Sequence, residues 1–252
     1  MKLKPNKKLT YFFHRKKGRN HSGKITIRHR GGGHKRRYRK LNFKNFKPTI
    51  ISGIVKNIEY DPNRTSKIML IHYLDGSKIY AISPKNIEIG HVINSNFNAP
   101  VRRGNSLPLK NIPLGTSIYN IEFIPGGGGK IARSAGTSAF VIAKDRKFVT
   151  LRLPSGEIRL FLESCWAIIG EVSNSKNTNR NKKKAGYSRW MGRRPKVRGV
   201  VMNPIDHPHG GGEGKTPIGK SHPVTPWGKP TLGKKTRSLT KYSKSLILQR
   251  RY

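Results

Sequence analysis

The sequence has few acidic residues, a single cysteine and no long apolar run. Its 252 residues include 11 Asp and Glu against 53 Lys and Arg, so the formal net charge is +42. Self-repulsion at that charge opposes a compact state unless a polyanion neutralises it, which disfavours a metabolic enzyme. No run of about 18 apolar residues is present, which excludes a membrane-spanning helix. The lone Cys165 excludes an internal disulfide framework and indicates a reducing compartment.

Acidic residues are missing altogether from the first part of the chain. Residues 1–58 hold 19 basic residues and no acidic one, and residues 172–252 hold 20 basic and two acidic residues. Between them, residues 59–171 hold 14 basic and nine acidic residues. The middle therefore has the composition of an ordinary globular protein, whereas the two ends are basic arms that need a polyanion to settle on.

Helical periodicity is also lacking, and short strand patterns take its place. Val149, Leu151 and Leu153 fall on one face of a segment and Thr150 and Arg152 on the other, which is the period of a half-buried strand. Similar β-branched or alternating patterns predict strands at residues 49–60, 67–73, 78–82, 117–124, 138–144, 147–153 and 157–162. Turn signals, such as Asp75-Gly76 and Pro154-Ser155-Gly156, separate neighbouring strands. The sequence predicts an all-β domain, or two small barrels in tandem that join near the Pro-rich stretch 105–115.

The chain ends have almost no apolar periodicity, so residues 1–47 and 191–252 are not expected to fold into strands. Such segments cannot bury enough apolar surface to offset their ordering entropy alone, but they can become ordered along a charged surface. Trp190 and Trp227 lie there among Lys, Arg and Gly. Stacking on bases or sugars and local packing are equally consistent with these two aromatics.

Two glycine-rich segments resemble phosphate-binding loops and fail as such. Residues 210–216 (GGGEGKT) have His209 where the motif needs its first glycine, and prolines follow where a helix should begin. Residues 126–130 (GGGGK) are followed by Ile131 rather than by Ser or Thr. Nucleotide hydrolysis is therefore not predicted.

A cluster of Asp206, His207 and His209 leaves three interpretations open. The histidines can hydrogen-bond RNA or fill a turn, which the sequence favours; they can handle a proton in catalysis; or they can contribute to a metal site. A further basic segment, residues 28–40 (RHRGGGHKRRYRK), groups arginines and lysines around three glycines. It is a solvated charge run or a nucleic-acid contact, and the glycines favour the second because they let backbone approach phosphate closely.

Several motifs together resemble the bacterial-type large-subunit ribosomal protein two family, over residues 24–252. They are RHRGGGHKRRYRK, EYDPNR at 59–64, LPSGEIRL at 153–160, RWMGRRPKVRGVVMNPIDHPHGGGEG at 189–214 and HPVTPWGKPTLGKKTR at 222–237. The insertion PIG at 217–219 and the tail KYSKSLILQRR resemble the plastid branch. The heavy use of Lys, Ile and Asn fits an AT-rich plastid or apicoplast genome, with the bacterial cytoplasm as the alternative location. The lysine-rich start departs from the family, so no contacts are carried over to residues 1–23.

The resemblance implies a fold and a set of partners. The fold is an OB-fold barrel at 48–111 and an SH3-like barrel at 112–190, flanked by basic extensions at 1–47 and 191–252. The implied function is that of a structural, primary rRNA-binding protein near the peptidyl transferase centre, which supports subunit association, tRNA binding and peptide bond formation. The implied partners are large-subunit rRNA, other ribosomal proteins, the small subunit and nearby tRNA, without a membrane. No cofactor or metal is expected, and structural Mg²⁺ would belong to the rRNA.

The resemblance also implies site residues. The disputed catalytic candidates are His207 and His209, and the chemistry is expected to belong to RNA. The expected RNA-binding residues are Arg28, Arg30, Gly32, His34, Lys35, Arg36, Arg37, Arg39, Arg189, Trp190, Arg193, Arg194, Arg198, His207, His209, Gly210, Gly211, Gly212, Lys215, Trp227, Lys234, Lys235 and Arg237. Two rival functions remain: a chromatin-packaging or generic single-strand binder, and a hydrolase or transferase that uses His209.

Overall fold

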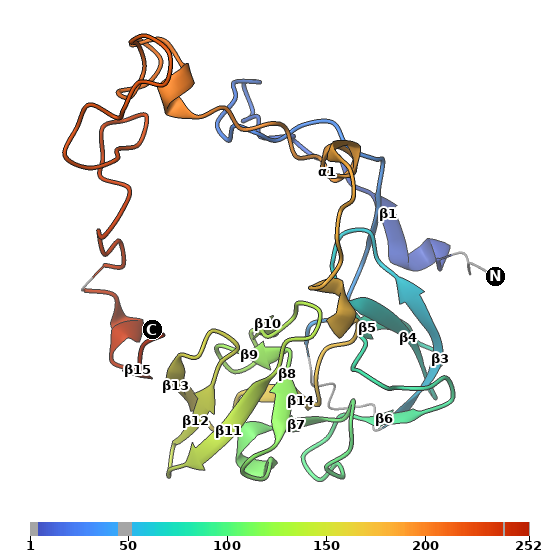
Figure 1. Ribbon diagram of the computed structural model, residues 1–252. Coiled ribbons are helices and arrows are strands. Elements are labelled where there is room, and N and C mark those ends of the chain that lie inside the picture. The colour runs from blue at the N-terminus through green and yellow to red at the C-terminus, as the bar shows by residue number, and fades with distance from the viewer. Residues whose placement is uncertain (1–4, 45–51, 239, 252) are drawn as a thin grey trace. The chain divides into compact units, whose positions relative to one another are not determined.

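The computed structural model describes residues 5–44, 52–238 and 240–251, and strands dominate it (Figure 1). Strands make up 31% and helices 9% of the chain, which confirms the predicted all-β class. No helix in the described ranges is long and apolar enough to cross a membrane. The chain divides into two compact units, which we describe separately. Unit 1 comprises Met1–His14, Lys35–Asn181 and Ser243–Tyr252, and unit 2 comprises Arg15–His34 and Lys182–Tyr242.

Unit 1 contains a four-stranded antiparallel sheet with the order β5-β4-β3-β6. Its strands are β3 (Ser52–Tyr60), β4 (Lys67–Tyr73), β5 (Lys78–Ile82) and β6 (Val92–Asn94). The predicted strands 67–73 and 78–82 and the turn between them are confirmed, with Gly76 at a φ of +77°. Residues 49–51 of the first predicted strand lie outside the described residues. Val55, Met69 and Ile71 contribute to the core under this sheet.

A second sheet in unit 1 has seven strands in the order β15-β13-β12-β11-β8-β14-β7. Its members are β7 (Ser106–Pro108), β8 (Ser117–Tyr119), β11 (Ala139–Lys144), β12 (Phe148–Arg152), β13 (Ile158–Leu162), β14 (Trp166–Ile169) and β15 (Ile247–Gln249). β9 (Ile121–Glu122) and β10 (Gly129–Ile131) form a separate pair. The predicted alternation of β12 is confirmed, because Val149 and Leu151 are buried while Arg152 is exposed.

The two sheets of unit 1 share a small apolar junction. Ile82 and Tyr119 pack there with Ile168, and the Tyr119 hydroxyl donates a hydrogen bond of 3.1 Å to the Ile82 carbonyl. Leu41 and Phe43 from the N-terminal arm pack against the same cluster. The sheets are therefore joined by apolar contact and not only by the connecting chain.

Several strands differ from the sequence prediction for local reasons. The predicted strand 117–124 is interrupted at Asn120, whose φ of +50° breaks the extended backbone between β8 and β9. β14 was not predicted because all four of its residues are buried, so it shows no polar–apolar alternation. Ser106–Pro108, which the predicted boundary at 111 placed with the first barrel, pairs with β14 of the seven-stranded sheet. The domain boundaries themselves stay predictions.

The prediction that the chain ends do not form strands is wrong for three short segments. β1 (Thr10–Phe12) pairs with β2 (Arg37–Arg39), and β15 pairs with β13 at the edge of the second sheet (Figure 1). The Leu160 N–H donates to the Leu246 carbonyl at 2.8 Å beside this pairing. Three-residue strands show no periodicity in the sequence. β15 forms because the β13 edge supplies its backbone partners, whereas β1 and β2 supply each other's in a separate two-stranded sheet.

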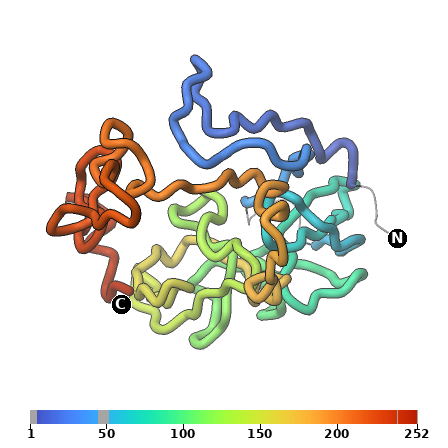
Figure 2. The backbone as a smooth tube through the Cα atoms, turned by 45° about the horizontal axis from the view of Figure 1, so that its top comes forward, coloured from blue at the N-terminus to red at the C-terminus, as the bar shows by residue number. Residues whose placement is uncertain are grey.

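Unit 2 consists mostly of turns and loops. Its one α-helix among the described residues is α1 (Ala185–Trp190), and the 3₁₀ turn η4 (Gly199–Val201) follows. The other 3₁₀ turns of the described residues lie in unit 1 or at its boundary with unit 2 in the sequence. They are η1 (Lys7–Leu9), η2 (Leu109–Asn111), η3 (Ser175–Asn177) and η5 (Tyr242–Lys244). Residues 15–34 leave and return as one long loop, drawn in blue in Figure 2. Of the described residues of unit 2, only His207 and Val224 are buried.

The two faces of β12 lead to a prediction about the stability of unit 1. Leu151 is fully buried, so Leu151→Asp places an unpaired charge in a small core and should lower the free energy of unfolding by roughly 3 kcal/mol or more. Thr150→Asp, on the half-buried face, should cost much less. Thermal denaturation followed by circular dichroism measures both, and equal destabilisation would contradict the assigned faces.

The pairing of β15 leads to a second prediction. A chain truncated after Tyr242 loses β15 and the acceptor of the Leu160 N–H, so hydrogen exchange at Leu160 should accelerate by about tenfold or more. Amides of β4, in the other sheet, serve as the internal control and should keep their protection. Unchanged exchange at Leu160 would mean that β15 does not hold the sheet edge.

Candidate nucleic-acid interface

Two basic motifs from opposite ends of the sequence pair through their backbones in unit 2. Residues 28–34 run beside residues 189–194, with an antiparallel bridge between Arg30 and Arg193. The hydrogen bonds are Gly31 N–H to Gly192 O at 3.1 Å, Arg194 N–H to His29 O at 3.0 Å and His34 N–H to Trp190 O at 3.0 Å. The arginines of both motifs are thereby held on one backbone ribbon.

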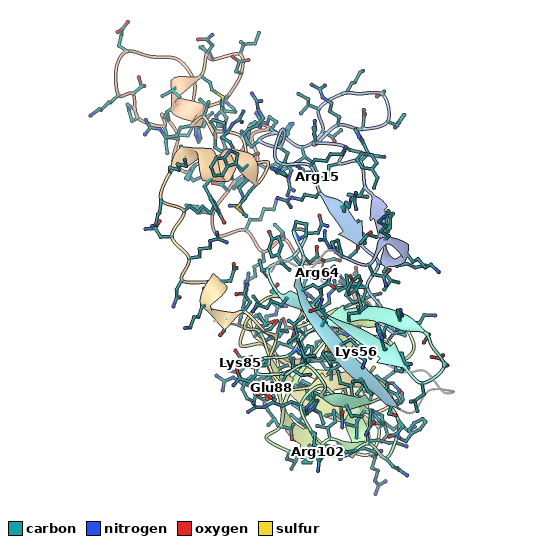
Figure 3. The ribbon with its side chains drawn as sticks, turned by 90° about the vertical axis from the view of Figure 1, so that its right-hand side faces the viewer. Arg15, Lys56, Arg64, Lys85, Glu88 and Arg102 are labelled. Atoms are coloured by element: carbon teal, nitrogen blue, oxygen red, sulfur yellow. The ribbon has the colours of Figure 1, made fainter. Side chains whose placement is uncertain are left out.

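Glycines allow this ribbon to close. Gly33 and Gly192 have φ values of +84° and +86°, a region that side chains disfavour. A Cβ at Gly33 would lie 2.9 Å from the Gly192 Cα and 2.8 Å from Nη2 of Arg15, so no side chain fits. Arg15, labelled in Figure 3, donates from its guanidinium to the Gly32 carbonyl at 3.0 Å. The glycines at 31–33 were predicted to let the backbone approach phosphate, whereas Gly192 and Arg15 were not singled out from the sequence.

The charge of unit 2 is strongly one-sided. Its sequence holds 22 Lys and Arg against two acidic residues, Asp206 and Glu213. Most of the predicted RNA-binding cations of this unit are exposed: Arg28, Arg30, Arg189, Arg193, Arg194, Arg198, Lys215, Lys234 and Lys235, with Arg237 half-buried. Such a surface attracts phosphates and releases their counterions when they bind.

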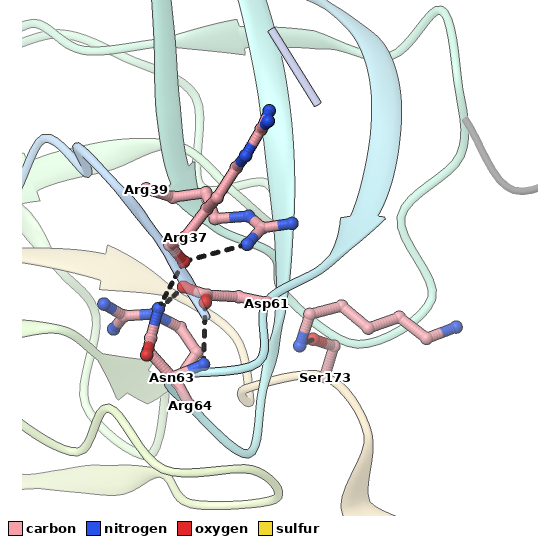
Figure 4. Close-up of polar contacts among 7 residues, drawn as sticks. Arg37, Arg39, Asp61, Asn63, Arg64 and Ser173 are labelled. Atoms are coloured by element: carbon pink, nitrogen blue, oxygen red, sulfur yellow. Dashed lines mark hydrogen bonds and ion pairs between the residues drawn. The ribbon is translucent and has the colours of Figure 1, made fainter. Parts of the chain in front are cut away.

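The other predicted cations, Lys35, Arg36, Arg37 and Arg39, belong to unit 1. Arg37 and Arg39 lie on β2, where the Arg37 carbonyl accepts hydrogen bonds from Asn63 Nδ2 at 2.8 Å and Arg39 Nη1 at 3.0 Å (Figure 4). Asn63 in turn donates its N–H to the buried Asp61 carboxylate, which also binds Arg64 at 2.7 Å. The predicted set is thus divided between the two units.

A further pair of arginines in unit 1 was missed by reasoning from the sequence. The guanidinium groups of Arg64 and Arg133 lie 5.5 and 4.8 Å from the centroid of the Phe43 ring. Arg133 also donates to the Gly129 carbonyl at 3.3 Å. The three residues come from distant parts of the sequence, so no local pattern could reveal the cluster.

Both histidines of the HPHGGG segment use a ring nitrogen to accept a backbone hydrogen bond. Nδ1 of His207 accepts from the His209 N–H at 3.0 Å, and Nε2 of His209 accepts from the Val224 N–H at 3.0 Å. The two rings are 4.7 Å apart between centroids. A ring nitrogen that accepts carries no proton, so each neutral ring has its proton on the other nitrogen.

This arrangement bears on proton transfer. Burial lowers the pKa of His209 below its usual value, and the neighbouring His207 and Lys220 lower it further, so the ring is neutral near pH 7. A general base needs a lone pair within reach of the reacting proton. In both rings, the unprotonated nitrogen is already directed at a backbone N–H group of the protein.

The glycines of the segment are packed against backbone. A Cβ at Gly210 would overlap the Asn203 carbonyl, and one at Gly211, whose φ is +88°, would lie 2.8 Å from the Pro204 ring. The Gly210 N–H donates to the His207 carbonyl and the Gly211 N–H to the Met202 carbonyl. Gly210 and Gly211 therefore allow the backbone to pack tightly here. Gly212, with a φ of +88°, follows in the same conformation as Gly211.

The structure distinguishes the two tryptophans of the arm. Trp190 packs locally, with Tyr187 at 6.3 Å between ring centroids and the Lys184 ammonium 5.0 Å from its ring. Trp227 stands at the third position of the turn 225–228 and is 77% exposed, with the Arg28 guanidinium 5.6 Å from its ring centroid. Both tryptophans are exposed, Trp190 at 55%, but Trp190 also contacts neighbours of its own segment, whereas Trp227 is the more exposed of the two.

The rejected phosphate loop 126–130 is bound by a carboxylate of the protein itself, and the Asp206 cluster is not placed to hold a metal ion. The Glu122 carboxylate accepts the N–H groups of Gly126 and Gly128 at 3.1 Å each, and that of Trp166 at 3.2 Å, so the loop is turned onto the protein itself. Across residues 5–44, 52–238 and 240–251, no group of three or more His, Cys, Asp or Glu side chains is placed to hold a metal ion.

Comparison with known families agrees with the motifs. Residues 6–95 match the model described as Ribosomal Proteins L2, RNA binding N-terminal domain, and residues 102–228 match Ribosomal Proteins L2, C-terminal domain. Domains of these two kinds are of OB-fold and SH3-like barrel type, which suits the two sheets of unit 1. The matched ranges together include both basic motifs of the ribbon, and the chain belongs to the ribosomal protein L2 family of RNA-binding, large-subunit proteins.

Proposed function

We propose that the protein is a structural, primary rRNA-binding component of the large subunit and that unit 2 is its main phosphate-binding surface. The observation that carries the proposal is the ribbon of residues 28–34 and 189–194, which displays arginines of both motifs in a unit with 22 basic and two acidic residues. Recognition would follow RNA shape, because the major groove of A-form RNA is too narrow for side chains.

The finer parts of the proposal rest on the motif resemblance. They are a position near the peptidyl transferase centre, and support of subunit association, tRNA binding and peptide bond formation. An organellar ribosome of plastid or apicoplast type is supported by the PIG insertion at 217–219 and by the Lys-, Ile- and Asn-rich composition. Structural Mg²⁺ would be bound by the rRNA and not by this chain.

The proposal assigns no catalytic step to the protein. The lone pairs of His207 and His209 that would accept a proton are engaged by backbone N–H groups. A generic single-strand binder would share the basic surface but would bind unrelated RNAs as tightly as rRNA. Competition between large-subunit rRNA and an unrelated RNA of equal length, at one salt concentration, separates that function from the one proposed.

The close approach at Gly33 provides a test of the ribbon. Gly33→Ala forces the two segments apart, so it should weaken binding to large-subunit rRNA about tenfold or more. Gly23→Ala is the matched control: Gly23 also has a positive φ, +77°, but a Cβ added there would meet no described atom within 4 Å. Filter binding at fixed salt measures both variants, and equal losses would show that backbone strain, not the ribbon, sets affinity.

The absence of a catalytic role for His209 can be tested in assembled particles. His209→Gln keeps an acceptor at the position of Nε2, so it should leave single-turnover peptide transfer by fully assembled subunits nearly unchanged. Gly210→Val should instead reduce the yield of particles, because its side chain overlaps the Asn203 carbonyl. Loss of about 100-fold or more in the chemical step for His209→Gln, at normal particle yield, would support catalysis instead.

A further inference from the structure

Unit 2 has almost no apolar core among its described residues. His207 and Val224 are the two buried residues among those described in this unit, and the Val224 N–H is bound by His209. His207 holds the backbone of His209 in the same way. Hydrogen bonds to imidazole nitrogens therefore help to stabilise unit 2, whereas apolar cores stabilise unit 1.

These hydrogen bonds connect the glycine segment to the turn that carries Trp227. Val224 begins that turn region and forms a bridge with Pro230, and the Thr225 N–H donates to the Lys229 carbonyl at 2.8 Å. The Gly228 N–H closes the turn onto the Thr225 carbonyl at 2.9 Å. The bond from Val224 to His209 thus anchors the base of the turn, and Trp227 stands at its tip.

Trp227 has the properties of a stacking platform. Its side chain is 77% exposed, and the guanidinium of Arg28 lies 5.6 Å from the ring centroid. An exposed indole beside a guanidinium offers a π face and a positive charge together, which fits a nucleobase and its phosphate. The charge of the unit, with 22 basic and two acidic residues, favours a polyanion over a protein partner.

We propose that Trp227 and Arg28 form a stacking site for an unpaired nucleobase, and that His209 is the positioning residue that holds this site through Nε2. The inference rests on the proposed RNA-binding function and adds a contact to a base where that function needs only contacts to phosphates. His207 supports His209 through Nδ1. His207 therefore needs Nδ1 as its hydrogen-bond acceptor, whereas His209 needs Nε2.

The base contact is tested with two oligonucleotides of equal length, an oligoadenylate and an abasic chain with the same sugar-phosphate backbone. The full-length protein should bind oligoadenylate roughly five- to 150-fold more tightly, as expected for one stacked base. Trp227→Leu should abolish this ratio and Trp227→Phe should keep most of it, since Phe retains a π face. Leu232→Ala, at another exposed apolar side chain of the unit, is the control and should change nothing.

The positioning role is tested by exchanging amide substitutes between the two histidines. An Asn amide oxygen takes the place of Nδ1 and a Gln amide oxygen that of Nε2, so His207→Asn and His209→Gln should preserve the oligoadenylate ratio. The crossed variants, His207→Gln and His209→Asn, should lose it while abasic binding, which measures phosphate contacts, stays within about twofold. No difference between matched and crossed variants would overturn the positioning role.

The outcomes separate this inference from the function on which it rests. If the protein binds both oligonucleotides equally, or if Trp227→Leu keeps the ratio, the stacking site is wrong and the phosphate-binding function stands. If the protein binds neither, the proposed function fails and the inference fails with it. Trp227 is exposed, so its substitution tests the site even if a histidine variant does not fold.

Discussion

The shortage of buried apolar surface in unit 2 is the constraint on which the rest of that unit depends. A unit that buries only one apolar side chain among its described residues gains little from the hydrophobic effect, which elsewhere dominates folding. Backbone pairing between 28–34 and 189–194 and the two histidine acceptors take over that role. Each such bond contributes only about 1 kcal/mol net, which leaves little to offset the self-repulsion of 22 basic residues against two acidic ones.

Unit 1, by contrast, is built around buried apolar side chains. Its two sheets have apolar cores and share a junction at Tyr119 and Ile168, and the unit as a whole holds nine of the 11 acidic residues of the chain. Two buried carboxylates of unit 1 have defined partners. Glu122 accepts hydrogen bonds from three backbone N–H groups, and Asp61 forms an ion pair with Arg64. A unit with apolar cores and a unit held mainly by hydrogen bonds therefore coexist in one chain, and the division matches the uneven distribution of charge along it.

Sequence patterns predicted what is local and missed what is not. β4 and β5 were predicted to the residue and β12 with its correct faces, because alternation and turn residues occupy adjacent positions. β14 lacks alternation and β15 needs the edge of β13, so neither left a signal. The site residues came from basic motifs and from resemblance, and their roles as RNA contacts remain predictions. The bridge of Arg30 to Arg193 and the acceptor role of each imidazole nitrogen depend on partners elsewhere along the chain, which no single segment encodes.

Segments that pair in the fold lie far apart in the sequence, which has a consequence for folding during synthesis on the ribosome. Residues 28–34 leave the exit tunnel long before residues 189–194, and at about 5–20 residues per second they wait roughly 10–30 s without their backbone partner. The β13 edge stays open until β15 emerges. A nascent chain therefore exposes a basic, glycine-rich segment and one open sheet edge together, and an open edge is a template for pairing with other chains.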